Sequence, residues 1–152
     1  MKSKNSELVL RLAKPEEIYS LRHKVLRPNQ TLADCRWPRD FEATTFHVGA
    51  FLEDRAISIA TFFPEAKPEL PARNPYRLRG MATEPHVKGS GAGRKVLAFG
   101  MQQLSERNCD LLWCNAREIA FGFYEKMGLS YEGDLFDIPS VGPHKVMWIK
   151  IK

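Results

Sequence analysis

Long apolar runs are missing from this sequence, and their absence excludes a chain anchored by membrane-spanning helices. The apolar runs are only a few residues long, whereas a helix needs about 20 apolar residues to cross a bilayer. The start of the chain, residues 1–7, also lacks the apolar stretch of a signal peptide. We therefore expect a cytoplasmic protein with no membrane partner.

Cysteine is scarce as well. Cys35, Cys109 and Cys114 are odd in number and form no Cys-x-x-Cys pair, which favours neither a disulfide framework nor a zinc site. We expect three reduced thiols and no bound metal. A chain of 152 residues, 43% of them hydrophobic, is long enough to bury one core but not two. Residues 1–152 are therefore predicted to form a single domain.

Positive charge is in modest excess. Lys and Arg outnumber Asp and Glu by 23 to 18, for a formal net charge of +5. Such an excess can bind nucleic acid or an anionic small molecule, or it can contribute to solubility alone. Basic residues gather between positions 22 and 39, and a group of this kind is more often a solvated face than an anion site. We expect no nucleic-acid partner; a nucleic-acid binder would show a steep salt dependence.

The spacing of apolar residues predicts an alternation of helices and strands. Pro15 followed by two acidic residues marks a helix start, and a period of two after Thr45 indicates strands. Residues 28–43 have no clear period and are predicted to be a functional or mobile loop, and residues 64–75, with four prolines, a second loop. In chain order the predicted elements are a helix from Pro15 to before Pro28, a hairpin of strands at 45–52 and 57–63, a strand at 76–83, a helix after the turn at 87–94, a strand at 110–114, a helix with Ile119, Phe123 and Met127 on one stripe and Gly128 at its end, and strands at 130–136 and 144–151.

The glycine-rich turn at residues 87–94 is the most informative segment. Glycines let the backbone approach a ligand closely, and the free N–H groups at a helix N-terminus favour an anion such as a pyrophosphate. A flexible turn without a ligand is the alternative. Two other phosphate motifs do not match: Arg94-Lys95 follows Gly93 where a P-loop needs Lys-Ser/Thr, and glycines at 89, 91 and 93 are spaced two and two, unlike the dinucleotide-binding pattern.

Three segments together resemble the GNAT N-acetyltransferase family. Lys88-Gly89-Ser90-Gly91-Ala92-Gly93 is similar to the acyl-CoA motif Gln/Arg-x-x-Gly-x-Gly/Ala, with lysine at the first position. Residues 78–83 are similar to the fourth strand of the family, and residues 120–129 resemble its Ala-x-x-Phe-Tyr-Glu-Lys-x-Gly-Phe block, with Leu129 in place of the last Phe. Arg117 stands where many relatives carry Asn.

The resemblance implies a fold and a cofactor. The implied fold is α/β, with a mixed, mainly antiparallel central sheet flanked by helices and splayed between its fourth and fifth strands, where coenzyme A would enter. The implied co-substrate is acetyl-CoA, with no metal. The implied coenzyme contacts are Met81, Ala82, Thr83, Lys88, Gly89, Ser90, Gly91, Ala92, Gly93, Arg94, Phe123 and Lys126.

Acetyl transfer to an amine needs an acid, an oxyanion donor and a base. The resemblance places the Tyr124 hydroxyl near the coenzyme sulfur, where it would protonate the leaving thiolate; a core aromatic is the alternative. A backbone N–H near Met81 or Ala82 would hold the oxyanion. His47 or His144 could be the base, although a lone histidine is more often structural, and Glu84 could act through water.

The acceptor is an amine that the sequence does not identify. We expect a small molecule that takes the acetyl group directly, with Arg22, Arg27, Asn115 and Arg117 as candidate contacts. If the arginines converge, they would match a carboxylate or phosphate on the acceptor; the alternative is that they are solvated. An acyl-CoA sensor without turnover and a protein acetyltransferase remain open. A homodimer is one assembly the chain could form.

Overall fold

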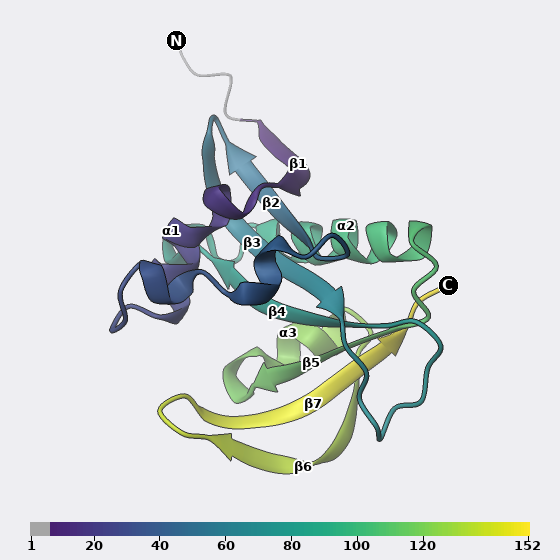
Figure 1. The fold of residues 1–152 in the computed structure, drawn as a ribbon. Helices are drawn as coiled ribbons and strands as arrows, with labels where there is room; N and C mark the ends of the chain where they lie inside the picture. The colour runs from purple at the N-terminus through teal and green to yellow at the C-terminus, as the bar shows by residue number, and fades with distance from the viewer. Residues whose placement is uncertain (1–6) are drawn as a thin grey trace. The chain divides into compact units, whose positions relative to one another are not determined.

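The computed structural model describes residues 7–152, which form strands, helices and the loops between them (Figure 1). In chain order the elements are β1 (Leu8–Ala13), α1 (Pro15–Leu26), the 3-10 turns η1 (Ala33–Cys35) and η2 (Pro38–Phe41), β2 (Phe46–Leu52), β3 (Arg55–Pro64), β4 (Pro75–Thr83), η3 (Pro85–Val87), α2 (Ala92–Glu106), β5 (Leu111–Arg117), η4 (Glu118–Ala120), α3 (Phe121–Lys126), β6 (Ser130–Ile138) and β7 (Gly142–Lys150). Within these residues no helix is both long enough and apolar enough to cross a membrane.

The strands follow the order β1-β2-β3-β4-β5-β7-β6. β4 and β5 are parallel, whereas β1–β2, β2–β3, β5–β7 and β6–β7 are antiparallel. This arrangement confirms the predicted mixed, mainly antiparallel sheet. The contacts divide the chain into two compact units, the first reaching Phe63 and resuming over Gly80–Gln102, the second comprising Pro64–Arg79 and Gln103–Lys152. The single domain stays a prediction.

In the first unit, helices cover both faces of the strands. Ile18 and Leu21 of α1 pack with Ile59 of β3 in one core cluster. On α2, Gly100 lies so close to Phe62 that an added Cβ would be 2.2 Å from the ring. Because residues 59 and 62 point to opposite faces of β3, α1 and α2 cover opposite faces. This explains why β2 is buried at every position but its last, although its sequence alternates.

In the second unit, β5 pairs with β7 over its whole length and β7 pairs with β6. A buried cluster joins β5 and β7 to the loop before β4; it consists of Leu70, Leu111, Trp113 and Val146. The β6–β7 register is interrupted between Glu132 and Phe136. Gly133 has a φ of 78° at this bulge, a conformation that glycine adopts readily. Figure 1 shows β6 and β7 as a long curved hairpin beside β5.

The helix after β5 differs from its prediction. A 3-10 turn at Glu118–Ala120 precedes a short α3 at Phe121–Lys126, and Ile119 is 86% exposed. The prediction that Ile119 shares a helical stripe with Phe123 and Met127 was therefore wrong, because the backbone of Ala120 (φ −104°, ψ 0°) separates Ile119 from the α-helix. Gly128 has a φ of 98° and ends the segment as expected.

Candidate functional site

The glycine-rich turn has the backbone geometry of an anion cradle. Gly89 and Gly91 have φ of 88° and 92°, in the region that side chains rarely adopt. A Cβ at Gly89 would meet nothing within 4 Å. The Ser90 hydroxyl accepts a hydrogen bond from the Ala92 N–H (3.3 Å), and α2 starts there. The remaining first-turn amides have no acceptor within the helix, so they can bind a phosphate.

The end of β4 also departs from a regular strand. Gly80 has a φ of 71°, and a Cβ at this position would lie 3.2 Å from the Trp37 ring and 3.4 Å from Nε of Arg22. Only glycine fits this conformation in this space. The oxyanion donor is predicted at the two residues that follow, Met81 and Ala82. Thr83 exchanges a 2.8 Å hydrogen bond with Ser58.

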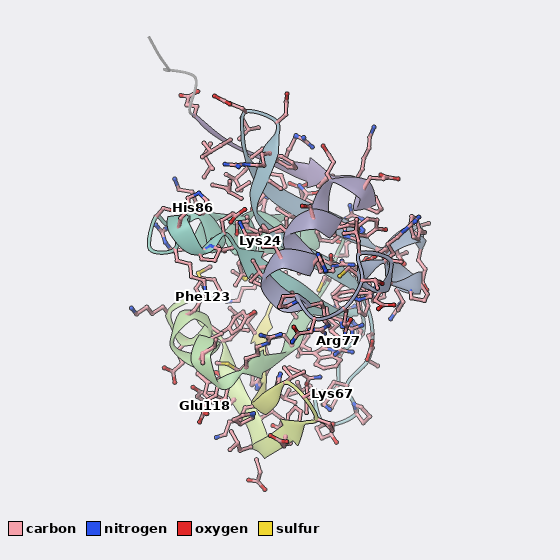
Figure 2. The ribbon with its side chains drawn as sticks, turned by 90° about the vertical axis from the view of Figure 1, so that its left-hand side faces the viewer. Lys24, Lys67, Arg77, His86, Glu118 and Phe123 are labelled. Carbon is pink, nitrogen blue, oxygen red and sulfur yellow. The ribbon has the colours of Figure 1, made fainter. Side chains whose placement is uncertain are left out.

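The Glu84 carboxylate is bound by a neighbouring basic side chain rather than free to act as a base. Its carboxylate accepts a 2.7 Å hydrogen bond from Nζ of Lys24, and Nδ1 of His86 lies 3.6 Å from the same oxygen; both partners are labelled in Figure 2. The hydrogen bond from Lys24 lowers the pKa of Glu84 below its ordinary value. A carboxylate of lowered pKa is a weaker base, which disfavours proton transfer through Glu84.

Four side chains of the first unit form a closed hydrogen-bonded ring. The fully buried Arg22 donates from Nη1 to Oδ2 of Asp40 (2.8 Å) and from Nη2 to Oγ1 of Thr61 (2.9 Å). Thr61 lies 2.8 Å from Nδ1 of His47, and Nε2 of His47 lies 3.1 Å from the carbonyl oxygen of Asp40. Since a carbonyl only accepts, Nε2 carries the proton and Nδ1 accepts from the Thr61 hydroxyl.

This ring decides the environment of two predicted site residues. His47 is 3% exposed, its lone pair is engaged, and burial lowers its pKa, so it is held neutral as a structural histidine. Arg22 has no exposed surface and also donates to the carbonyl of Cys35 (2.6 Å). Its guanidinium is therefore neither solvated nor presented to an acceptor, but supports the segment that contains η1 and η2.

The second unit holds Tyr124 on α3. The side chain is 6% exposed, and its pKa is raised well above the ordinary value, first by burial and then by Cys114. Burial also raises the pKa of Cys114 to about 12. Tyr124 is therefore protonated at neutral pH, as a general acid must be, and Cys114 is a thiol rather than a nucleophile.

One face of β5, β7 and β6 brings together three predicted residues. Asn115 lies opposite Val146, and Arg117 lies opposite His144. Directly opposed residues of antiparallel strands point to the same side, so Asn115, Arg117 and His144 share a face. Cys114, which influences Tyr124, points to the other face of β5. The end of β5 therefore carries candidate groups on both sides.

His144 has the tautomer that a base requires. It is 3% exposed, and Nδ1 lies 2.7 Å from the carbonyl oxygen of Gly142. Nδ1 must donate to that carbonyl, which leaves the lone pair on Nε2. The ring stacks on Phe136 of β6 at 5.8 Å between centroids, which holds its orientation. Of the two predicted histidines, only His144 combines a fixed tautomer with a lone pair that no described hydrogen bond engages.

A pocket of about 300 Å³ opens on the Asn115 face of the second unit. Four charged lining residues were not predicted from the sequence: Lys67, Glu69, Glu132 and Asp134. Lys67 and Glu69 lie in the proline-rich loop, and Glu132 and Asp134 lie in a strand that was predicted to be regular. A glycine inside that predicted strand, Gly133, is the signal that could have indicated the bulge.

The loop between β3 and β4 is held against β5 by Trp113. The indole N–H donates to the carbonyl oxygen of Glu65 (2.9 Å). Lys67 and Arg77, labelled in Figure 2, lie over its ring at 5.4 and 5.0 Å from the centroid. These contacts bring the loop's charged residues to the mouth of the pocket.

The other predicted contacts lie in α3 or directly after α1. Arg27 follows α1, and its guanidinium donates to the carbonyl of Leu26 (3.0 Å). Phe123 packs edge-to-face on Tyr124 at 5.1 Å, and Lys126 is the exposed last residue of α3. Among residues 7–152, no group of three or more His, Cys, Asp or Glu side chains is placed to hold a metal ion.

Comparison with known proteins matches these features to one family. The model of the Acetyltransferase (GNAT) family matches residues 10–129. The Bacillus subtilis (strain 168) protein named Uncharacterized N-acetyltransferase YitI is 39% identical over 133 residues, which are 88% of this chain and 89% of that protein. An aminoglycoside 6′-N-acetyltransferase complexed with coenzyme A shares the fold, with a TM-score of 0.76 at 11% identity over 95% of this chain and 97% of its own.

A second structure with the same fold is FeeM, an N-acyl amino acid synthase from uncultured soil microbes, with a TM-score of 0.76 at 10% identity, covering 95% of this chain and 91% of its own. At these identities the two structures show the fold alone. The family match over residues 10–129 and the 39% identical relative show more: this chain belongs to the GNAT family and is an acyl-CoA-dependent acetyltransferase.

Proposed function

We propose that the chain transfers an acetyl group from acetyl-CoA directly to the amine of a small molecule. The observation that carries this proposal is Tyr124, a buried tyrosine on α3 whose phenol is protonated at neutral pH and can therefore donate a proton. An acyl-CoA sensor has no need of a proton donor for a leaving thiolate. The acid on α3 therefore favours turnover over binding alone.

The glycine-rich turn would hold the coenzyme. Gly89 has open space around its Cα, and the first amides of α2 can donate to the pyrophosphate. Lys88 and Arg94 are exposed beside it and add positive charge. The contacts predicted for Ser90 and Gly93 depend on the same backbone, while Thr83, Phe123 and Lys126 are proposed contacts to the rest of the coenzyme. Bound acetyl-CoA supplies the thioester.

The transfer step needs two proton movements. The amine nitrogen attacks the thioester carbonyl, the new C–N bond forms, and the C–S bond breaks as the sulfur takes the Tyr124 proton. The amine proton passes to a base, for which the lone pair on Nε2 of His144 is the proposed site. A backbone N–H at Met81 or Ala82, next to the turned peptide at Gly80, would stabilise the oxyanion.

Asn115 and Arg117 are the proposed acceptor contacts on the His144 face. The small-molecule assignment is supported by the pocket beside Asn115, whose volume of about 300 Å³ lies at the lower end of the range for small-ligand sites. A solvent-exposed protein segment would need no such hollow. A cytoplasmic location and a homodimer remain predictions.

The deciding experiment is coenzyme A release from acetyl-CoA, measured over a panel of small amines and, in parallel, over peptides with free N-termini or lysines. We expect release that depends on a small amine, with the N-acetyl product identified by mass. Coenzyme binding without release on any acceptor would favour the sensor, and release on peptides alone would favour a protein acetyltransferase.

A further inference from the structure

The pocket on the Asn115 face has more anionic than cationic side chains in its lining. Its lining includes three carboxylates, those of Glu69, Glu132 and Asp134, but one ammonium, that of Lys67. Lys67 is already engaged, since Nζ lies 3.7 Å from Oε1 of Glu69 and 5.4 Å from the centre of the Trp113 ring. Within residues 7–152, Glu132 and Asp134 have no ion-pair partner. The net charge of the side chains that line the pocket is therefore negative.

An unpartnered acceptor lies beside these carboxylates. Oδ1 of Asn115 is buried and has no hydrogen-bond partner within the described chain. A buried polar atom without a partner destabilises the fold unless something binds it. Asn115 is also one of the residues that line the pocket, so its amide adds an uncharged polar group beside the carboxylates.

A bulge in β6 lies beside the acidic groups of the pocket. Asn115, Val146 and Glu132 form one row across three strands, so Asn115 and Glu132 are separated by about 10 Å, twice the strand spacing. The register shift after Glu132 and the positive φ of Gly133 turn the chain here. Asp134, two positions after Glu132, lines the same pocket.

The rest of the lining is apolar. Phe136 and Val146 supply hydrocarbon surface, and Phe136 also stacks on the ring of the proposed base, His144. A chain of methylene groups could therefore lie on the apolar floor between the acidic groups and the base. A protonated amine, with three donors and no acceptor, matches the acidic end.

We infer that the acceptor is a di- or polyamine, and that the pocket binds a protonated amino group other than the one acetylated. This inference rests on the proposed function and names its substrate class. It replaces the anion-bearing acceptor considered from the sequence, because Arg22 is fully buried and the carboxylates around the pocket would repel a carboxylate on the acceptor.

The first test is binding, which does not depend on turnover. Isothermal titration of the full chain with 1,4-diaminobutane and with butylamine compares two ligands with the same four-carbon chain that differ by one charged amino group. We expect the wild type to bind the diamine at least about tenfold more tightly, with the preference shrinking as salt rises. Equal affinities for the two amines would overturn the inference.

Matched variants locate the subsite. Glu132→Gln and Asp134→Asn each remove one carboxylate of β6 from the pocket, and Asp137→Asn removes an exposed carboxylate of β6 outside it. We expect each pocket variant to lose most of the diamine preference and Asp137→Asn to keep it. Loss of the preference in all three variants alike, or in none, would contradict the assignment.

Acetylation then separates this inference from the proposed function. We expect kcat/KM to favour the diamine by about tenfold or more in the wild type and to fall for the diamine alone in the pocket variants. Diamine-selective binding without acetylation of any amine would leave the subsite standing and overturn the proposed function. Equal acetylation of the two amines, or a preference for an amino acid over its amide, would leave the acetyltransferase standing and overturn the subsite.

Discussion

Arg22 of α1 and Asp40 of η2 form an ion pair of 2.8 Å in which both side chains are buried, at 0% and 1% exposed. Asp40 also accepts a 2.8 Å hydrogen bond from the Trp37 N–H, and the Trp37 ring lies 3.6 Å from the guanidinium carbon. The pair thus ties the irregular segment after α1 to the sheet through Thr61.

Breaking this pair is predicted to destabilise the protein strongly. Asp40→Asn leaves the buried guanidinium uncompensated, a change that typically lowers the free energy of unfolding by about 3–5 kcal/mol. The control is Glu42→Gln, which removes the exposed 3.1 Å pair with Arg39 and should lower it by less than about 1 kcal/mol. Urea unfolding measures both; equal losses would show that the buried pair contributes no more than a surface pair.

His47 is predicted to make stability depend on pH. Its folded pKa is lowered below 6.5 by burial, so the unfolded chain binds the proton more readily. The contribution of neutral His47 to the free energy of unfolding is complete above about pH 6.5 and decreases as the pH falls below that value. His47→Gln should flatten the decrease in unfolding free energy between pH 7 and 5, whereas the exposed His86→Gln should not. An unchanged slope in His47→Gln would assign the pH dependence to other groups.

Gly91→Glu is predicted to abolish acetyl-CoA binding. The new carboxylate would stand where the amides of α2 are proposed to hold a pyrophosphate, and the φ of 92° disfavours any side chain. Acetyl-CoA at 100 times its dissociation constant should stabilise the wild type by about 2.7 kcal/mol, seen as a raised melting temperature. Gly91→Ala has the same backbone strain without the charge, so acetyl-CoA should still raise its melting temperature, by less than in the wild type. A wild type that acetyl-CoA does not stabilise would remove the turn from the coenzyme site.

Tyr124→Phe is predicted to lower kcat by about 100-fold with little change in coenzyme affinity, because the lost proton donor acts only as the thiolate leaves. Tyr131→Phe is the matched control, since the Tyr131 hydroxyl donates to Glu125 (2.6 Å) on the surface. Turnover should be unaffected there. An unreduced kcat in Tyr124→Phe, measured where chemistry limits the rate, would assign Tyr124 to packing.

Much of the fold could be predicted from local pattern. Pro15 at the start of α1, the alternation of β2 and β3, and the positive φ of Gly128 all follow from residue chemistry acting over a few positions. The glycine turn before α2 was predicted in the same way. Ile119 was placed wrongly because helical spacing alone does not show where a 3-10 turn ends and an α-helix begins.

Only the tertiary structure decided the partners and the solvation of the polar and ionisable side chains. The sequence alone shows that Arg22, His47 and Asn115 could bind or react, and the family motif indicates acetyl-CoA chemistry. The sequence does not show that Arg22 donates hydrogen bonds to Asp40 and Thr61, which are 18 and 39 positions away. It also does not show that strand register places Glu132 in one row with Asn115. The charge and hydrogen-bonding capacity of a side chain are local properties, but its solvation and its partners depend on which distant strands lie beside it, and these set its pKa and its availability to a substrate.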